Sequence, residues 1–396
     1  MKKLFCIIIF IFSVFTIFAQ SFNHGHIKQN SYFEVIPYQE ILGLPVVQVV
    51  INGKTYNFFF DTGAMLTISD RVYRELNPQV IGHREIGSIS GERKNMRIVQ
   101  IPEIHIQGIT FKNSRGVVLN EEAREFYECI GIDGFVGSNM LRNSIVNIDG
   151  QSKHIIITNN IKKLSTEKRE YQKMYLYGQQ SRPYIIITMQ KGENKIHEKV
   201  IIDTGLKGFF KMNLSNARYY DERYDIVEII DESEGAFTYG IHGTAPKQRH
   251  CLLHISELVV GETSFNNLIT TTINIDSSIG AELIKYGTII MDFKRKRFYF
   301  EPFDNINSDN LSNKPTTFSF SVQNNKLVVG IIWDKTLESQ INIGDEILSI
   351  NDINIESWDL CQLYLLNNIR FSENNNVELR DINNGKIKRV DLKRLQ

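Results

Sequence analysis

Short hydrophobic runs of roughly four to eight residues recur along most of the chain, and glycine, asparagine and aspartate separate them. Isoleucine, valine, phenylalanine, tyrosine and threonine dominate these runs, and many of the runs alternate with polar residues. Such composition and spacing are typical of β-strands rather than of amphipathic helices. Clear examples are residues 46–51, 97–101, 155–158, 184–189 and 298–300. The pattern therefore predicts a mainly β protein.

Two places along the chain predict a tight hairpin. Asn52-Gly53 separates the runs 46–51 and 55–60, and Asn-Gly is a residue pair that two-residue turns favour. This hairpin sets an apolar strand beside the strand that leads to Asp61. The segment Lys191-Gly192-Glu193-Asn194 lies before Asp203 at the position that corresponds to the Asn52-Gly53 turn before Asp61.

The tripeptide Asp-Thr-Gly occurs twice, once from Asp61 and once from Asp203, and each copy directly follows an apolar run. One such match arises easily by chance, but a second feature repeats with it. Apolar residues lead to Gly137 after the first copy and to Gly280 after the second, at nearly the same distance from the aspartate. The paired spacing indicates an internal duplication of roughly 140 residues.

A carboxylate that follows a buried strand lies in a poorly solvated place, where its charged form is costly. Two such carboxylates about 3 Å apart share one proton and titrate as a unit. The ionised member then takes a proton from a bound water, while the protonated member polarises a carbonyl group. We therefore predict that Asp61 and Asp203 form a catalytic pair, which needs neither a metal nor another cofactor.

The order of strand, Asp-Thr-Gly, hairpin region and apolar pair with glycine resembles one lobe of a retropepsin-like aspartic protease. Two lobes in one chain resemble the pepsin arrangement, in which each lobe supplies one aspartate. The resemblance covers residues from about 40 to 304 and implies duplicated β-barrel lobes at 30–158 and 181–304, with a polar connection at 159–180. The implied function is an aspartic endopeptidase, which hydrolyses peptide bonds of polypeptides bound extended between the lobes.

The resemblance also implies roles for residues around the pair. Each threonine hydroxyl of the repeated tripeptide crosses to the backbone of the other lobe, each motif glycine lets the backbone approach the carboxylates, and the two downstream glycines lie beneath them. A flap hairpin covers the substrate, with tips expected at 87–91 and 235–240. The supporting residues are Thr62, Gly63, Thr204, Gly205, Gly137 and Gly280, and the flap residues are Ser88 and Tyr239. For Tyr239, an ordinary half-exposed strand position is the alternative.

The second motif departs from the family pattern because Leu206-Lys207 follows Gly205, where a small or hydroxyl-bearing residue is typical. This departure keeps a second hypothesis open: a non-catalytic envelope protein that binds peptides or serves as an adaptor on the same fold. A Lys207 ammonium folded into the site, or Leu206 in the place of the water, favours that alternative.

The C-terminal part, residues 317–396, resembles a PDZ domain and follows a polar linker at 305–316. The resemblance rests on a strand expected at 326–332, on the dipeptide Gly344-Asp345 before the next expected strand, and on an expected helix with Ser357 as its N-cap. It implies an α+β domain that binds a peptide or protein ligand as an added strand and serves substrate recruitment or regulation. The loop near 321–325 lacks the Gly-Leu-Gly-Phe character that holds a peptide carboxylate.

The N-terminus has the features of a secretory signal peptide at 1–19, because Lys2-Lys3 precedes an apolar run that ends at Ala19. We therefore expect a secreted or periplasmic protein with no membrane span after cleavage; an uncleaved membrane anchor is the alternative. The 396 residues exceed one ordinary domain. The 45 basic residues equal the 45 acidic ones, so charge gives no case for nucleic acid as a partner.

Cysteine and histidine residues give no sign of a disulfide framework or a metal site. Signal cleavage leaves Cys129, Cys251 and Cys361, and this odd number, with one in each predicted domain, favours buried apolar cysteines. The nine histidines show no ligand spacing, and His24-Gly25-His26 lies in a segment expected to be mobile.

Overall fold

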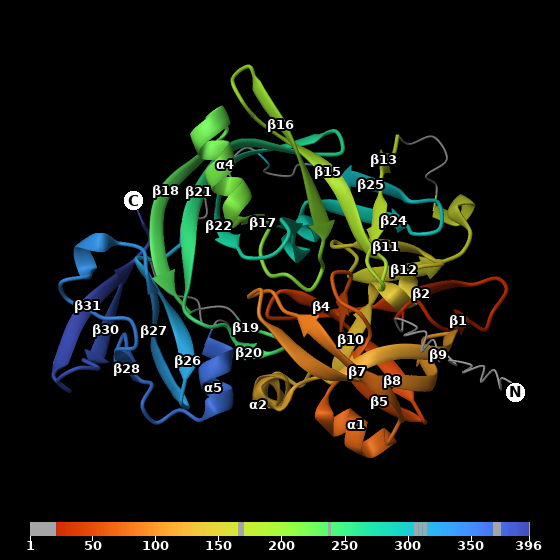
Figure 1. Ribbon diagram of the computed structural model, residues 1–396, viewed down its shortest axis with the longest axis horizontal. Helices are drawn as coiled ribbons and strands as arrows, with labels where there is room; N and C mark the ends of the chain where they lie inside the picture. Colours follow the sequence, from red (N-terminus) through yellow and green to blue (C-terminus); the bar gives the residue numbers. More distant parts are fainter. Residues whose placement is uncertain are drawn as a thin grey trace, which may run out of the picture.

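The computed structural model describes residues 21–164, 170–236, 239–304, 308, 311, 315–366 and 374–395. The predicted signal peptide at 1–19 lies outside the described residues, and so does most of the predicted linker at 305–316. The protein is mainly β, as the hydrophobic pattern predicts, and its two largest sheets correspond to the two copies of the repeat (Figure 1). Among the described residues, no helix has the length and apolarity needed to cross a membrane.

The first copy of the repeat forms a nine-stranded sheet in the order β1-β9-β6-β10-β5-β4-β8-β7, with β3 paired to β4. Its elements are β1 (His26–Ile27), β3 (Gln39–Ile41), β4 (Leu44–Ile51), β5 (Lys54–Asp61), β6 (Thr67–Ile68), α1 (Asp70–Leu76), β7 (Gln79–Gly87), β8 (Arg93–Ile106), β9 (Ile109–Val118), α2 (Glu121–Cys129), β10 (Gly134–Gly137) and α3 (Ser138–Leu141). At the predicted hairpin, Asn52 and Gly53 have φ values of 50° and 77°. The turn between β4 and β5 requires this left-handed conformation, so the hairpin prediction is confirmed.

The second copy forms an eight-stranded sheet in the order β14-β15-β16-β23-β17-β22-β21-β18. Its elements are β14 (Tyr175–Tyr177), β15 (Arg182–Lys191), β16 (Asn194–Ile202), β17 (Phe210–Asn213), α4 (Leu214–Tyr224), β18 (Val227–Gly235), β21 (Gln248–Val260), β22 (Thr263–Ile273), β23 (Ser278–Ile279) and the 3₁₀ turn η2 (Ala281–Lys285). A small pair, β19 (Tyr239–Gly240) and β20 (Gly243–Thr244), lies between β18 and β21. Strand β5 pairs in parallel with β10, and β16 pairs in parallel with β23, so the duplication is present in the strand pairing as well.

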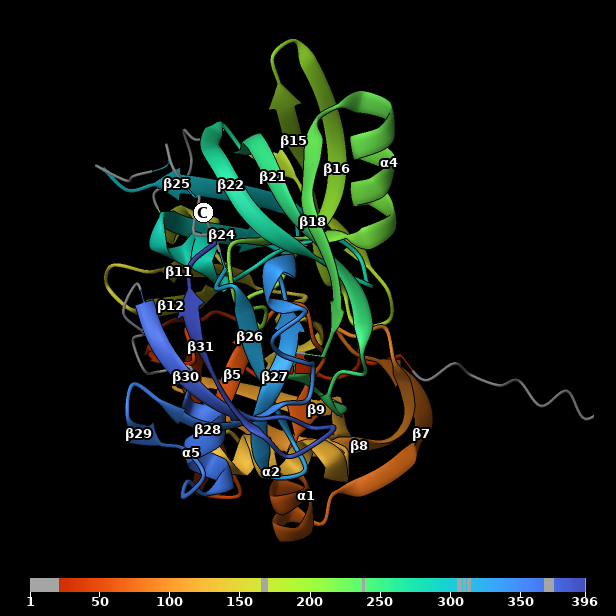
Figure 2. The ribbon, with the colours of Figure 1, turned by 90° about the vertical axis from the view of Figure 1, so that its left-hand side faces the viewer.

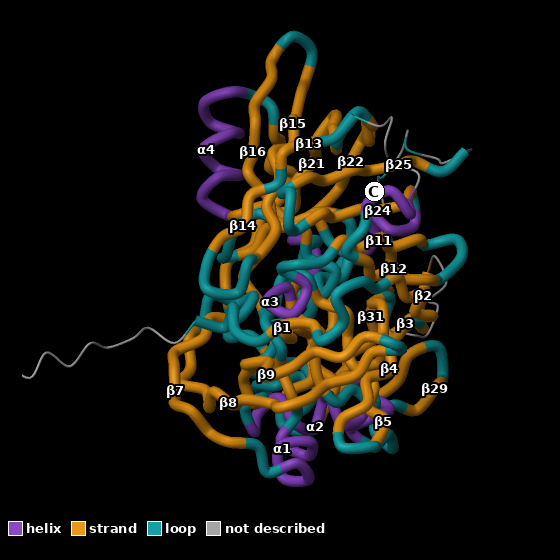
Figure 3. Tube along the Cα trace, turned by 90° about the vertical axis from the view of Figure 1, so that its right-hand side faces the viewer, coloured by secondary structure: helices purple, strands orange, loops and turns teal. Residues whose placement is uncertain are grey.

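A third sheet is shared by the two halves, which the local pattern does not predict. Its order is β13-β25-β24-β11-β12-β2, and Figure 3 shows β25, β24, β11, β12 and β2 following one another between the halves. The strands are β2 (Phe33–Pro37), β11 (Ile145–Asp149), β12 (His154–Thr158), β13 (Gln172–Lys173), β24 (Gly287–Asp292) and β25 (Arg297–Pro302). The halves meet in the antiparallel pair β11–β24, where Ile145 faces Asp292. One apolar cluster contains both Ile148 and Met291, so the two halves share a core.

The C-terminal domain is a six-stranded sheet with its own apolar cluster. Its elements are β26 (Phe318–Gln323), β27 (Lys326–Ile332), the 3₁₀ turn η3 (Lys335–Leu337), β28 (Glu346–Ile350), β29 (Ile353–Asn354), α5 (Leu360–Leu365), β30 (Asn374–Arg380) and β31 (Ile387–Lys393). The strand predicted at 326–332 is confirmed as β27. The predicted helix cap is wrong, because Asp359 rather than Ser357 is the N-cap residue of α5. The Asp359 carboxylate accepts the backbone N–H of Gln362, and the Gln362 side chain accepts that of Asp359, which makes a reciprocal capping box.

A disulfide joins Cys129, at the end of α2, to Cys361 in α5. The prediction that these cysteines are buried apolar residues outside any disulfide was therefore wrong. The two residues are 232 positions apart and belong to different parts of the fold. A count of one cysteine per predicted domain excludes cross-links within domains but not between them. The remaining Cys251 is buried, as predicted. Figure 2 shows the result, a C-terminal domain that lies across both halves, with α5 beside α2.

Candidate active site

The two aspartates stand where buried strands end. Asp61 is the last residue of β5, and Asp203 directly follows β16. Phe60 and Ile202, the residues before them, are almost fully buried, so each loop starts from a fixed point in the core. Both aspartates are half-buried.

The carboxyl groups of Asp61 and Asp203 are hydrogen-bonded to one another. Oδ1 of Asp61 accepts the backbone N–H groups of Gly63 and Ala64, both at 2.9 Å. Oδ1 of Asp203 accepts the N–H of Gly205 at 3.0 Å. Two carboxyl groups this close in a half-buried place are not both ionised at low cost, so we expect the pair to hold one shared proton.

The two motif threonines exchange hydrogen bonds between the halves. The Thr62 hydroxyl donates to the Ile202 carbonyl at 2.6 Å, and the Thr204 hydroxyl donates to the Phe60 carbonyl at 2.5 Å. Each hydroxyl oxygen also accepts the backbone N–H of the other threonine at 3.1 Å. Both side chains are buried, so these bonds hold the two loops in register without competition from water.

Each motif glycine faces the opposite carboxylate. A Cβ at Gly63 would lie 2.4 Å from Cγ of Asp203, and a Cβ at Gly205 would lie 2.2 Å from Oδ2 of Asp61. Real Cβ atoms do not approach other atoms so closely, so only glycine permits this arrangement.

The two downstream glycines lie where the chain crosses beneath the pair. Gly137 pairs with Asp61 at the end of β10, and a Cβ there would lie 2.1 Å from the carbonyl carbon of Met65. A Cβ at Gly280 would lie 2.2 Å from the Gly208 carbonyl oxygen. The structure therefore brings together all eight residues that the sequence places at or around the pair.

Burial first, and the neighbouring carboxylate second, raise the pKa of Asp61 well above its ordinary value. Burial also raises the pKa of Asp203, but the Gly205 N–H and the hydrogen bond from Asp61 act against this rise. Hydrogen bonds donated to an ionised carboxylate favour its charge. Both carboxyl pKa values of the pair therefore lie above the ordinary value, and in the reaction proposed below Asp61 carries the shared proton.

We expect Asp61→Asn to be more stable than the wild-type protein at neutral pH. A raised pKa means that the folded state binds the proton more tightly than the unfolded chain does. This stabilisation is fully present below the ordinary carboxyl pKa of about 4 and is lost as the pH rises through the raised value. Asparagine has no such proton, so the melting temperature of the variant should increasingly exceed that of the wild type as the pH rises from about 4 towards neutrality. A difference in melting temperature that does not change with pH contradicts the raised pKa.

The predicted first flap is the hairpin of β7 and β8. Its tip lies against the second half, because the Ser90 carbonyl accepts the Gln248 side-chain N–H at 2.6 Å. Ser88 is buried at this tip, and its hydroxyl oxygen lies 2.7 Å from that of Ser90. The bond between the two serines holds the turn of the flap together.

Tyr239 belongs to an interface with α2 and α5 rather than to a flap tip. Its hydroxyl donates to the Glu122 carbonyl at 3.0 Å, and its ring lies 4.1 Å from that of Phe126 and 5.5 Å from that of Tyr364 between centroids. The side chain is half-buried. Residues 237–238, which complete the predicted second tip, lie outside the described residues.

Two residues near the pair were not predicted from the sequence. Tyr127 of α2 is buried, and burial together with the charge of Asp61 raises the pKa of its phenol. The charge of Arg182, at the start of β15, acts on Asp203 and opposes the rise in its pKa that burial causes. Neither residue stands in the repeated motif, so only the tertiary fold reveals that they are near the carboxylates.

Lys207 lies at the surface of the second half, beside Glu282 and Lys285. Leu206 is buried, and its backbone N–H donates to the Asp203 carbonyl at 3.1 Å. Among the described contacts, the Lys207 ammonium does not fold onto the carboxylates. Lys207 therefore gives no support to the alternative of a binding protein.

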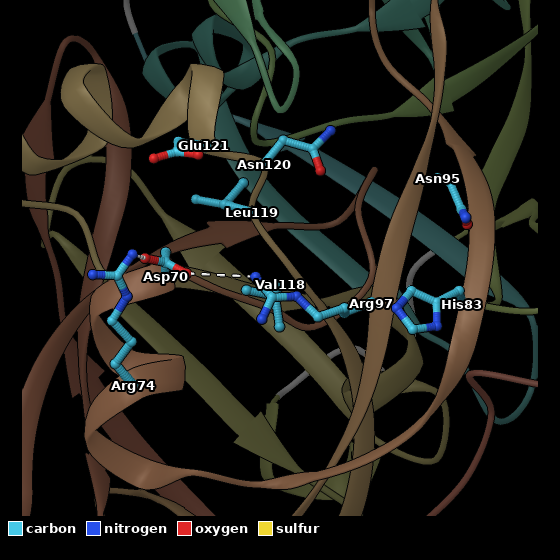
Figure 4. A pocket seen from close by; sticks show the side chains of 9 residues that line it. All are labelled: Asp70, Arg74, His83, Asn95, Arg97, Val118, Leu119, Asn120 and Glu121. Carbon is cyan, nitrogen blue, oxygen red and sulfur yellow. Dashed lines mark ion pairs between the residues drawn. The ribbon is translucent and has the colours of Figure 1, made fainter.

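A polar cavity of about 350 Å³ lies in the first half, beside the flap strands (Figure 4). Asp70 on α1 forms ion pairs across it with Arg74 at 2.6 Å and with Arg97 at 3.6 Å. A second cavity of about 270 Å³ lies in the second half, where burial lowers the pKa of Lys211 to about 8 and its ammonium donates to the Thr271 hydroxyl at 2.5 Å. Neither aspartate of the pair lines either cavity.

Within the described part of the chain, no three His, Cys, Asp or Glu side chains are grouped so that they could hold a metal ion. The histidines near the N-terminus are part of the fold rather than of a mobile segment, which corrects the expectation. Nδ1 of His24 lies 2.9 Å from the Asn113 carbonyl, and His26 pairs with Lys112 of β9.

Residues 47–140 match the family model for aspartyl proteases. The match runs from β4 to α3, so it includes the Asp61 loop and Gly137 but none of the second half. Among solved structures, the crystal structure of basic 7S globulin from soybean is similar at 8% sequence identity and a TM-score of 0.40, over 71% of this chain and 96% of that chain. A search of curated proteins finds no match.

Proposed function

We propose that this protein is an aspartic endopeptidase. The observation that carries the proposal is the hydrogen-bonded pair of Asp61 and Asp203, in which each carboxylate faces the glycine of the opposite loop. The aspartyl protease match over residues 47–140 supports it, because that segment supplies one half of the pair.

In the proposed reaction, the Asp203 carboxylate accepts a proton from a water molecule, and the water oxygen attacks the peptide carbonyl carbon. Asp61 donates its proton to the carbonyl oxygen at the same time, which gives a neutral tetrahedral diol. As the C–N bond breaks, Asp61 takes a proton back from a diol hydroxyl, and Asp203 gives its proton to the leaving nitrogen. The pair returns to its starting state with one proton.

The substrate in this proposal is a polypeptide bound in an extended form between the halves, and the C-terminal domain serves recruitment or regulation. A secreted or periplasmic location belongs to the same proposal, and its basis is the signal peptide that the sequence predicts at 1–19.

Cleavage of an unstructured protein substrate from about pH 3 to 8, with and without pepstatin, tests the proposal. We expect a bell-shaped pH profile. Activity should fall at high pH as the pair loses its shared proton, and at low pH as the second carboxylate becomes protonated. Inhibition by pepstatin supports the aspartic mechanism, whereas resistance reports only the shape of the pockets. Absence of cleavage at every pH favours the alternative, a non-catalytic peptide-binding or adaptor protein.

A further inference from the structure

A segment of the second half connects all three parts of the protein. We define this bridging segment as residues 235–236 and 239–248, between the end of β18 and the start of β21. In Figure 1 its strands β19 and β20 lie between the C-terminal domain and α2. Ile241 packs against the apolar cluster that contains Met65 and Ile86, and against the cluster that Ala64 borders. The bridging segment therefore reaches the loop that carries Asp61.

The bridging segment is hydrogen-bonded to the predicted flap, the hairpin of β7 and β8. The buried His242 ring lies 2.8 Å from the Ile86 carbonyl through Nε2, and its Nδ1 lies 3.1 Å from the Asn120 side-chain nitrogen. In the tautomer that carries its proton on Nε2, the ring donates to the Ile86 carbonyl and accepts the Asn120 side-chain N–H. The Lys94 ammonium donates to the His242 carbonyl at 3.4 Å, and Gln248 bonds the Ser90 carbonyl. The flap has to break these bonds before it can lift.

The C-terminal domain holds the start of the bridging segment. Gly330 is the extra residue of a bulge in β27, and its carbonyl accepts the Ala236 N–H at 2.9 Å. A Cβ at Gly235 would lie 2.3 Å from the Gly330 carbonyl oxygen, and a Cβ at Gly330 would lie 2.7 Å from that of Ala236. This contact of two backbones therefore requires a glycine on both sides.

A covalent bond fixes the same domain to the first half. The Cys129–Cys361 disulfide joins α2 to α5, next to the ring cluster of Phe126, Tyr239 and Tyr364. Both cysteine residues are partly exposed. The bridging segment is thus enclosed between α2, which carries one cysteine, and a domain that carries the other.

We propose that the C-terminal domain is a disulfide-locked clamp whose ligand is the bridging segment of its own chain, and that reduction of Cys129–Cys361 releases the flap. A dithiol supplies two electrons and two protons, becomes a disulfide itself, and leaves two cysteine thiols. Docking of the domain then depends on noncovalent contacts alone, so the flap opens more often. The inference that this release regulates peptide cleavage rests on the proposed function. The inference that the disulfide is coupled to the flap does not depend on that function.

Hydrogen–deuterium exchange on the full chain tests the coupling without any need for activity. We expect the amides of residues 86–94 and 239–248 to exchange at least about tenfold faster in C129S/C361S than in the oxidised wild type. The distant hairpin of β15 and β16 should exchange at the same rate in both. A dithiol should accelerate the wild type and leave C129S/C361S unchanged. Unchanged exchange of residues 86–94 after reduction overturns the proposal.

A second variant keeps the disulfide and removes the other attachment. Gly235→Ala places a methyl group against β27, because the three atoms nearest to it all belong to residues 330 and 331. It should accelerate exchange of residues 86–94, whereas Glu193→Gln, at an exposed position in the turn between β15 and β16, should not. Wild-type exchange in Gly235→Ala overturns the role of the Gly330 contact.

Activity measurements separate this proposal from the proposed function. Reduced wild type and C129S/C361S should cleave an unstructured protein at least about fivefold faster than the oxidised wild type. Faster exchange with no cleavage by any form supports the clamp and contradicts the peptidase. Cleavage at one rate in all forms supports the peptidase and overturns the clamp as its regulator.

Discussion

Asp61→Asn and Asp203→Asn should each lower kcat/KM for an unstructured protein substrate by at least about 10³-fold. An asparagine in place of Asp61 holds no acidic proton to give to the carbonyl oxygen. An asparagine in place of Asp203 has no negative charge with which to take a proton from water. Either change therefore removes one of the two proton transfers on which the proposed reaction depends. The folded structure should persist, because an asparagine oxygen still accepts the loop N–H groups that Gly63 and Gly205 donate.

The matched control is Asp304→Asn, an exposed aspartate at the surface. It should keep wild-type kcat/KM, and circular dichroism should give the same spectrum for all four proteins. More than about a tenth of wild-type activity in either pair variant contradicts a reaction that needs both carboxyl groups.

Gly205→Ala should also lower the rate of cleavage strongly, although it leaves every titratable group in place. The added methyl group would lie 2.2 Å from Oδ2 of Asp61, so that carboxylate or its loop has to move. Movement of Asp61 breaks its hydrogen bond with Asp203 and the geometry that keeps one proton on the pair. We expect a loss of at least about 100-fold, since small displacements of reacting groups have effects of this size.

Gly192→Ala is the control for Gly205→Ala. It lies in the hairpin turn before Asp203, and a methyl group there meets no atom within 4 Å. Its φ of 60° makes alanine strained, at a cost of about 1–2 kcal/mol, so this variant should melt at a lower temperature yet keep its activity. If both variants keep wild-type activity, the steric role of Gly205 is contradicted. If both lose activity to the same extent, the loss is due to lower stability and not to a displaced carboxylate.

The local features of the fold could be predicted because each depends on residues close in sequence. The Asn52-Gly53 turn needs only two residues with positive φ, and the strands that end at Asp61 and Asp203 are indicated by their apolar runs. The repeat of Asp-Thr-Gly and of the later glycines then indicates which residues come together, since a duplicated half offers the same loop twice.

The connections between parts could not be predicted, because nothing local specifies them. The apolar sequence of residues 145–149 indicates a strand. It does not indicate that this strand pairs with β24 of the other half. Cys129 and Cys361 are 232 residues apart, and no spacing rule links two helices of different domains. Tyr239 has the aromatic character expected of a flap, and only the position of α2 and α5 shows what it contacts.

The six-stranded sheet shared by the two halves also determines at what stage of synthesis the pair of Asp61 and Asp203 can assemble. Strand β2 at residues 33–37 pairs with β12 at 154–158, and β11 pairs with β24 at 287–292, so early strands leave the ribosome long before their partners. Contacts between such distant segments form late in folding. Asp61 likewise meets the Thr204 hydroxyl and Asp203 only after the second half has been made. A nascent chain that ends before residue 203 therefore carries one carboxylate without the other, and assembly of the sheet is the step that completes the pair.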